Sequence, residues 1–598
     1  MKKLISLLLS VCMLATMLAV PAFAAEAGTY TGTASGKYDN SIDVAVTIDA
    51  DGTILNVEIT RNADADDGTG MSTPAAEAIP GKIVEAQSLE IDAVTGSTMT
   101  SQGIVNAVKA ALTSAGLDPD SYKGTAAEAE AVVKTETEAT TQVLVIGAGI
   151  AGLTSALSAR QSGAEVTIID KMPYAGGTTN TAGGILVCVD SELFAENRLE
   201  SDSLDQMLAY WQQRQSVSGV DSGYPDWDRL TNVLADTGKT VDWLVESGVE
   251  FSSEPYAAST AYPMALANGG GAGLIDMLVD VCQKNGVTLL LNTKGTELVT
   301  DESGAVVGAK AETDTEIITF HAGSVVLATG GISQNEELVA KYSPKLDRAG
   351  LVPTSAVSHT GDGFLMALAV GAGTFDVFAT PLFAQIVDPQ LSALTDTSAL
   401  TIYAQLGVNS NGVRFADEAA SAGWDSYDHT ASDMIQDGNA PFWYIYDSSD
   451  EAVAAALEAG VEAGIVAKGE TIEELALNMH VYTAQLKATY ETYSAAVEAG
   501  EDAEYGKAAA FLQPIATAPY YAVKWYPTTF GSAGGVTTTD QGQVTTQDGT
   551  VIAGLYAAGE MSNRYYYNEN YILAASLGLY STMGHRAGAA AAAEAMAK

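Results

Sequence analysis

Cysteine is scarce in this sequence, which has only Cys12, Cys188 and Cys282 in 598 residues. So few thiols do not build a disulfide framework. The sequence has no C-x-x-C pair for zinc or an iron–sulfur cluster, and no C-x-x-C-H for a c-type haem. We therefore expect no metal site in this chain.

Positive charge is also scarce, because 28 lysines and arginines face 74 aspartates and glutamates, which gives a net charge of −46. Nucleic-acid phosphates and anionic membrane surfaces repel such a chain. The sequence therefore predicts no nucleic-acid partner, and the acidic excess favours solubility outside the cell.

Long apolar runs are missing after the first residues, since none approaches the ~18 residues that a membrane span needs. The chain starts with a basic segment (1–3), an apolar stretch (4–20) and an A-x-A end (22–24). This order is typical of a secretory signal peptide. We predict a signal peptide over 1–25 and an exported, extracytoplasmic protein, secreted or at the cell surface, that does not span a membrane. The alternative is a buried N-terminal helix.

A chain of this length exceeds one hydrophobic core, so several domains are expected. Residues 26–120 are predicted to form a small α+β domain, with strands at 42–48 and 54–59 and a helix at 104–115. Residues 121–141, which are rich in alanine, glutamate and threonine, are predicted to be a linker.

The larger domain, over 142–598, opens with a glycine-rich turn. Gly147, Gly149 and Gly152 follow an apolar strand and open a helix, in the G-x-G-x-x-G spacing of dinucleotide-binding folds. The first glycine permits the tight turn, the second lets the backbone approach a pyrophosphate, and the third allows close helix–strand packing. Asp170 ends the next strand and is placed to accept hydrogen bonds from ribose hydroxyls. The alternative is a turn without a ligand.

Further glycine- and hydroxyl-rich segments suit a flavin diphosphate, and they lie at 170–173, 176–184, 328–331, 359–363 and 554–560. This order of motifs resembles the fumarate reductase and succinate dehydrogenase flavoprotein superfamily, which includes urocanate reductases and ketosteroid dehydrogenases, over about residues 142–597. The resemblance implies a non-covalent FAD. The expected FAD-binding residues are Gly147, Gly149, Ala151, Gly152, Asp170, Lys171, Gly177, Thr178, Thr179, Gly183 and Gly184, to which the resemblance adds Gly330, Gly331, Asp362, Gly559 and Glu560.

A second flavin motif lies in the smaller domain, over residues 92–98. It resembles the FMN-binding domain that carries its flavin through a phosphoester to threonine, and it matches at Asp92, Thr95, Gly96 and Thr98. It departs from the usual alanine at Ser97. The resemblance implies a covalent FMN at Thr98, attached by a separate flavin transferase. The alternative is a simple helix-capping segment.

The substrate-binding residues depart from the family pattern. Residues 409–418 match the family motif N-x-x-G-x-R-F-x-x-E, with Arg414 at its arginine, but the proton-donating arginine of fumarate reductases does not follow. Most of the arginines and histidines that hold a dicarboxylate are missing, so fumarate is not the expected substrate. Arg414 could donate the proton in their place, but a structural role is the stronger alternative. His359 as a base is a further alternative, as are Asp425, Tyr427 and His429.

Tyrosines occupy the position of the missing clamp, at 565–567 and at Tyr571. A phenol can donate a proton, polarise a carbonyl and stack on a cyclic substrate. Tyr566, Tyr571 and Arg414 are therefore the catalytic candidates, and packing roles are the alternative for each tyrosine.

We predict an α/β fold with a Rossmann-type FAD-binding domain, an α+β capping domain inserted at about 375–515, and the small α+β FMN-binding domain. The leading hypothesis is reduction of an activated C=C bond in a small-molecule enoate or enone. Electrons from a membrane or extracellular donor would enter at FMN and pass to FAD. A dehydrogenase that works in the reverse direction, and a secreted electron carrier without a substrate, are the alternatives.

Overall fold

The protein is described here by a computed structural model. The described residues are 27–35, 41–63, 72–91, 94, 97–122, 134–216, 222–256, 262–344, 350–379, 384–392, 394–419, 442–529, 531–568, 570–572 and 574–598, apart from the side chains of 98, 99 and 120. The chain divides into two compact units, Met1–Ala131 and Val132–Lys598. The predicted signal peptide lies outside the described residues. No described helix combines the length and the apolar character needed to cross a bilayer.

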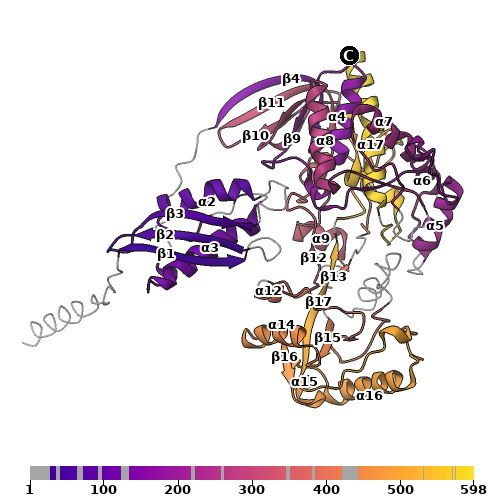
Figure 1. The fold of residues 1–598 in the computed structure, drawn as a ribbon. Helices are drawn as coiled ribbons and strands as arrows, with labels where there is room; N and C mark the ends of the chain where they lie inside the picture. Colours follow the sequence, from indigo (N-terminus) through magenta and orange to yellow (C-terminus); the bar gives the residue numbers. More distant parts are fainter. Residues whose placement is uncertain are drawn as a thin grey trace, which may run out of the picture. The chain divides into compact units, whose positions relative to one another are not determined.

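The smaller unit is an antiparallel sheet of β1 (Gly28–Ser35), β2 (Ser41–Ile48) and β3 (Ile54–Asn62), with helices α2 (Thr73–Ala86) and α3 (Thr98–Ser114) (Figure 1). Every second side chain of β2 is buried, as expected for a strand with one face in a core. The two predicted strands and the predicted helix are confirmed. β1 was not predicted, because its threonines and glycines carry no apolar alternation.

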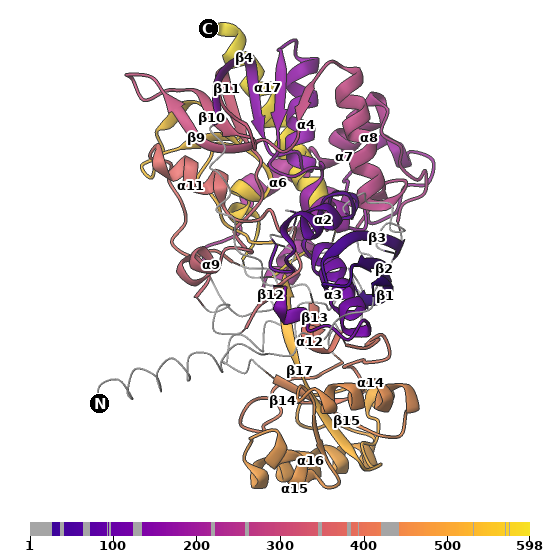
Figure 2. The same ribbon diagram turned by 90° about the vertical axis from the view of Figure 1, so that its left-hand side faces the viewer.

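The larger unit contains an eight-stranded sheet whose main path runs β18–β19–β11–β4–β5–β8, with β9 and β10 extending from β11. Strands β19, β11, β4, β5 and β8 pair in parallel, which is the expected Rossmann-type arrangement. Helices α4 and α17 lie beside β4 and β11 in both views (Figures 1 and 2). The bounds are β4 (Thr135–Ile146), β5 (Val166–Ile169), β8 (Thr288–Leu290), β9 (Lys294–Thr300), β10 (Val306–Glu312), β11 (Glu316–Leu327), β18 (Gln543–Thr545), β19 (Val551–Ala557), α4 (Ile150–Gln161) and α17 (Ala575–Ala597).

Strand β4 starts earlier than the sequence indicated. Residues 135–141, which were assigned to the linker, pair in register with the first half of β11. The prediction of a linker up to 141 is therefore wrong for these residues. Their side chains alternate between exposed and half-buried, so the segment lacks the apolar signal of the buried half that follows.

The capping domain has its own sheet, in the order β12–β17–β15–β14, with β13 and β16 also paired to β17. Its central strand β17 (Tyr520–Thr529) lies beyond the predicted limit of about 515, and that boundary is corrected here. The other strands are β12 (Val352–Pro353), β13 (Ala384–Val387), β14 (Leu406–Val408), β15 (Phe442–Asp447) and β16 (Ala467–Gly469), and the helices are α12 (Pro389–Ser392), α14 (Glu451–Glu462), α15 (Ile472–Asn478) and α16 (Thr483–Ala499).

Between β5 and β8 of the larger sheet the chain forms η4 (Gly177–Thr181), β6 (Ile185–Val187), α5 (Leu204–Ser216), α6 (Trp227–Leu234), α7 (Thr237–Ser247), β7 (Met264–Leu266) and α8 (Gly270–Lys284). Helix α9 (Glu336–Tyr342) precedes β12, α11 (Asp362–Ala369) lies between β12 and β13, and η7 (Gly559–Ser562) and η8 (Arg564–Tyr566) follow β19.

Candidate functional site

A long cavity opens at the carboxyl ends of β4 and β5, where doubly wound sheets bind their ligands. The space inside it, counted together with its open mouth, is about 1360 Å³. Twelve of the predicted FAD-binding residues line it, namely Gly147, Gly149, Ala151, Asp170, Lys171, Gly177, Thr178, Thr179, Gly330, Asp362, Gly559 and Glu560.

Four predicted residues do not line the cavity but make room beside it. A Cβ on Gly152 would lie 1.9 Å from the Gly147 carbonyl oxygen, so this glycine permits the expected close packing of α4. A Cβ on Gly184 would lie 2.3 Å from the backbone of Gly270. A Cβ on Gly183 would meet only the side chain of Ile185, whereas a Cβ on Gly331 would clash with the side chain of Glu560.

The turn between β4 and α4 is built for close approach of a phosphate. Gly147 has a φ of +107°, and a Cβ there would lie 2.3 Å from the carbonyl oxygen of Ala328. The Cβ position of Gly149, by contrast, has nothing nearer than 3.7 Å. Helix α4 begins directly afterwards at Ile150, so its free N–H groups face the cavity where an anion is favoured.

At one end of the cavity, Asp170 accepts backbone N–H groups from Ala148 at 2.7 Å and from Met172 at 2.8 Å. Burial raises the pKa of this carboxyl, although both hydrogen bonds oppose the rise. Each carboxylate oxygen keeps a second lone pair, so Asp170 can still accept ribose hydroxyls as predicted.

Asp362 lies at the same end between two lysines. Its carboxylate is 2.5 Å from Lys171 Nζ and 3.3 Å from Lys294 Nζ, and it also accepts the Thr360 hydroxyl at 2.8 Å. Burial alone would raise the pKa of Asp362, but Lys171 and then Thr360 and Lys294 outweigh it, so the pKa is lowered. Both cavity-facing lysines are thereby engaged with a carboxylate.

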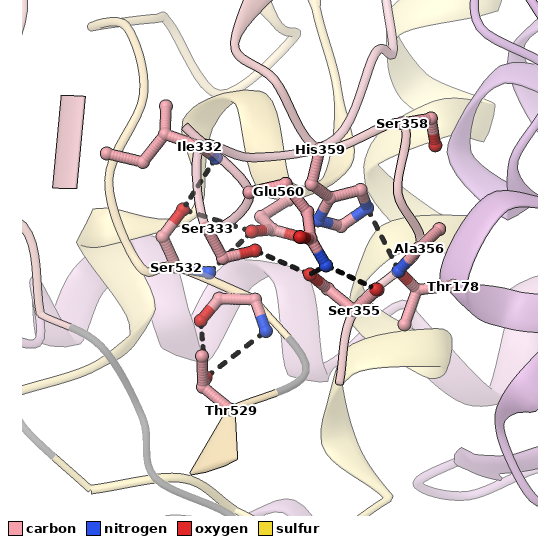
Figure 3. A network of polar contacts seen from close by, with 12 residues as sticks. Thr178, Ile332, Ser333, Ser355, Ala356, Ser358, His359, Thr529, Ser532 and Glu560 are labelled. Carbon is pink, nitrogen blue, oxygen red and sulfur yellow. Dashed lines mark hydrogen bonds and ion pairs between the residues drawn. The ribbon is translucent and has the colours of Figure 1, made fainter. Parts of the chain in front are cut away.

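His359 and Glu560 also line the cavity and lie close to each other (Figure 3). His359 Nε2 is 3.0 Å from the Thr178 hydroxyl, and Nδ1 is 3.5 Å from Glu560 Oε2. The other carboxylate oxygen of Glu560 accepts the Ser532 hydroxyl at 3.0 Å. A Cβ on Gly330 would lie 2.6 Å from the His359 ring. The A-T-G-G segment therefore leaves space for this pair.

The opposite end of the cavity is lined by phenols. Tyr567 and Tyr571 stack with ring centroids 6.3 Å apart, and the Tyr567 hydroxyl lies 3.4 Å from Ser576 Oγ near the start of α17. Burial raises the pKa of both phenols. Tyr580 also lines this end and accepts a hydrogen bond from Asn563 Nδ2 at 2.7 Å. These groups stay neutral and can act as proton donors.

The predicted catalytic residues are not all brought together. Tyr571 lines the cavity, and Tyr567, which is not among the predicted catalytic residues, lies beside it. Tyr566 is buried outside the lining, with its carbonyl accepting Trp211 Nε1 at 2.9 Å. The prediction that places Tyr566 at the site is therefore corrected.

Arg414 lies in the capping domain, outside the cavity lining. It is 2% exposed, pairs with both oxygens of Glu418 at 2.9 and 2.8 Å, and contacts Asp502 at 2.8 Å. Lys507 lies 3.2 Å from Glu418 within the same cluster. These contacts favour the structural role of Arg414 over proton donation.

Sequence reasoning missed several lining residues. Lys294, Ser532, Asn563 and Tyr580 carry no local motif, although Asn563 lies three residues after the segment expected to touch FAD. The predicted FMN motif lies mostly outside the described residues, at 92–93 and 95–96. Thr98 is the first residue of α3, and its side chain is not described.

The residues present fit an FAD. The glycine turn before α4 leaves room for a diphosphate, and Asp170 can accept hydrogen bonds from a ribose. The same cavity is also lined by tyrosines and apolar side chains. His359 Nδ1 is buried without a hydrogen-bond partner, which marks this part of the cavity as a polar site.

Comparison with known proteins agrees with this fit. The family model for the FAD binding domain matches residues 142–570, and the model for the FMN-binding domain matches residues 38–113. The urocanate reductase of Eggerthella lenta is 30% identical over 89% of this chain and 87% of that protein. The vinyl phenol reductase of Lactiplantibacillus plantarum is 30% identical over 70% of this chain and 89% of that protein.

A longer relative and a solved structure extend the comparison. The NADH:acrylate oxidoreductase of Vibrio harveyi is 28% identical over 90% of this chain, which spans 58% of that protein's length. The open conformation of a flavocytochrome c3 fumarate reductase superposes with a TM-score of 0.56 and 26% identity, over 78% of this chain and 80% of that one. The chain therefore belongs to the fumarate reductase and succinate dehydrogenase flavoprotein superfamily, with an FMN-binding domain ahead of its FAD-binding domain.

Proposed function

We propose that this chain is a flavin-dependent reductase of an activated C=C bond, acting on a substrate that is bulkier and less charged than fumarate. The relatives named above include reductases of urocanate and vinyl phenol and an acrylate oxidoreductase, which supports the reaction class. An alkene that carries an aromatic ring, such as an aryl-acrylate, suits the site.

The phenolic end of the cavity carries this proposal. Tyr571 stacks there on the fully buried Tyr567, and an aromatic ring in the cavity lining favours a flat, cyclic partner. Among the described lining residues there is no arginine, and both lysines are paired with Asp362. Arg564 is also unavailable as a carboxylate clamp, since it is 4% exposed and donates to the carbonyls of Val377 and Asn568 at 3.2 and 3.0 Å.

When held by the glycine turn and Asp170, FAD would supply the hydride that the β-carbon of the alkene takes. Tyr571 holds a proton on Oη, and the raised pKa of this buried phenol keeps the proton in place until the α-carbon takes it. Tyr567 is 1% exposed and packs against both Trp211 and Tyr571, so it supports the ring of Tyr571, and its hydroxyl contact with Ser576 fixes the phenol. The apolar walls keep water away from the developing charge.

We also propose that the protein is exported and receives its electrons through FMN. The sequence of the first 25 residues supports export, and the FMN-binding match over residues 38–113 supports a flavin in the smaller unit. Attachment at Thr98 would retain FMN outside the cell, where a dissociable cofactor is diluted away.

An anaerobic screen tests the proposed reaction. The purified holoprotein is mixed with a reduced viologen and one candidate substrate, and the rate of viologen oxidation is compared with the rate without an alkene. The candidates are fumarate, urocanate, hydroxycinnamates, vinyl phenol and a ketosteroid. We expect turnover with an aromatic or cyclic alkene and little with fumarate. Silence across the panel with both flavins reducible would favour an electron carrier, and fast fumarate turnover would contradict the phenolic site.

A further inference from the structure

His359 is held between two partners of different chemistry. Its side chain is 6% exposed and faces the Thr178 hydroxyl through Nε2 and the Glu560 carboxylate through Nδ1. Thr178 Oγ1 also accepts the backbone N–H of Ala356 at 2.9 Å, which fixes its position. Figure 3 shows the ring between these partners.

These contacts decide where the ring carries its proton. Nδ1 makes no hydrogen bond, but it lies 3.5 Å from Glu560 Oε2, and the negative charge of that carboxylate favours a hydrogen on Nδ1 over a bare lone pair. On the other side, a hydroxyl can either donate to a bare Nε2 or accept from a protonated one. The neutral ring and the cationic ring therefore both fit, and only the Thr178 hydroxyl hydrogen has to turn.

We propose that His359 takes up a proton from solvent when the bound FAD receives two electrons. It is a positioning residue that holds the new positive charge against Glu560. Reduction adds negative charge to the cavity, and a cation beside it offsets that charge. The electrons come from the reductant, the proton comes from water, and no bond of the protein is broken. This role differs from that of a base acting on substrate, because both ring nitrogens lie against protein groups, Nε2 against Thr178 and Nδ1 against Glu560.

The other titratable groups near His359 and Glu560 are not expected to take up this proton. Tyr580 faces Glu560 from α17, and burial keeps this phenol neutral by raising its pKa. Asp362, three residues further along the chain, is neutralised by Lys171 and Lys294.

Proton uptake during reduction tests the inference directly. Full-length holoprotein is reduced stoichiometrically with a reduced viologen, whose oxidation moves no protons, in weak buffer containing a pH indicator. The measurement covers about pH 5–8, the range in which imidazoles titrate. His359→Asn keeps an N–H near the Nδ1 position but does not titrate. We expect it to take up about one proton fewer per chain, with the FAD potential falling less steeply by ~30 mV per pH unit.

Two further variants make the result decisive. His585→Asn changes a histidine that stacks on Trp243 outside the cavity, and it should match the wild type. Thr178→Val keeps the imidazole but removes the acceptor for Nε2–H, so its uptake should fall toward that of His359→Asn. Equal uptake by the wild type and FAD-loaded His359→Asn at every pH would overturn the inference. The experiment contains no alkene, so its outcome is independent of the proposed reaction.

Discussion

The substitution Gly331→Ala should damage the FAD site through Glu560. A Cβ at this position would lie 1.8 Å from Glu560 Oε1 and 2.5 Å from Ser532 Oγ. Real Cβ contacts do not fall below 3.0 Å, so Oε1 must retreat by about 1.2 Å. That movement breaks the hydrogen bond in which the Ser532 backbone N–H donates to Oε1 at 2.5 Å.

The expected size follows from the lost hydrogen bond. A hydrogen bond to a charged group contributes about 1.5–3 kcal/mol, and each ~1.4 kcal/mol is tenfold in affinity. FAD should therefore dissociate roughly 10- to 100-fold more readily from the variant. The assay is the recovery of flavin fluorescence as holoprotein is diluted, which gives the dissociation constant of FAD.

A second substitution and a matched control sharpen this test. Adding Glu560→Asp shortens the carboxylate and withdraws it from the new methyl group, so the double variant should bind FAD more tightly than Gly331→Ala alone. Gly81→Ala makes the same change in α2, where a Cβ meets nothing within 4 Å, and should leave FAD binding unchanged. Wild-type affinity in Gly331→Ala, or no recovery in the double variant, would refute the reasoning.

Three further predictions follow from the site and its surroundings. Arg414→Met should destabilise the capping domain by about 3–5 kcal/mol in denaturant unfolding, because it leaves buried carboxylates unpaired, and FAD content should stay that of the wild type. Tyr571→Phe should lower kcat by about 10²–10⁴-fold, whereas Tyr566→Phe should keep a kcat near that of the wild type. Since burial raises the pKa of Tyr571, the wild-type rate should show no loss from phenol ionisation below about pH 10. The two lysines hold the pKa of Asp362 below the ordinary value of an aspartate, so its contribution to stability is present above about pH 4 and is lost as the pH falls further. Thermal unfolding of Asp362→Asn should therefore show a smaller acid dependence there than that of the wild type.

The nucleotide-binding half of the site was predictable because its signal is local. The glycine spacing, the flanking strands and Asp170 lie within one short stretch, and close packing leaves few residues possible at Gly147 and Gly152. The strands of the smaller unit were predictable for a similar reason, since β2 alternates buried and half-buried side chains.

The substrate end of the site was only partly predictable, because the side chains of neighbouring tyrosines point in different directions. Residues 564–566 form a 3₁₀ helix, in which successive side chains point about 120° apart, at three residues per turn. Tyr565 therefore packs against Phe375 and Tyr566 is buried outside the lining, whereas Tyr567, which follows the helix, lines the cavity. The sequence showed a tyrosine cluster but not which member faces the ligand.

Arg414 illustrates the limit set by long-range contacts. Its motif and Glu418 lie close together in the sequence, but Asp502 and Lys507 come from a distant segment to complete the cluster. No local pattern reveals that this arginine is enclosed by charges rather than directed at a substrate.

The central claim is that the FAD cavity reduces a flat alkene and does not select a dicarboxylate. The most direct measurement is rapid mixing of the fully reduced holoprotein with one alkene under anaerobic conditions, following reoxidation of the flavin absorbance in a single turnover. The account predicts that a hydroxycinnamate or vinyl phenol reoxidises the flavin much faster than fumarate, and that Tyr571→Phe slows this phase. Reoxidation that is fastest with fumarate, and unaffected by Tyr571→Phe, would contradict it.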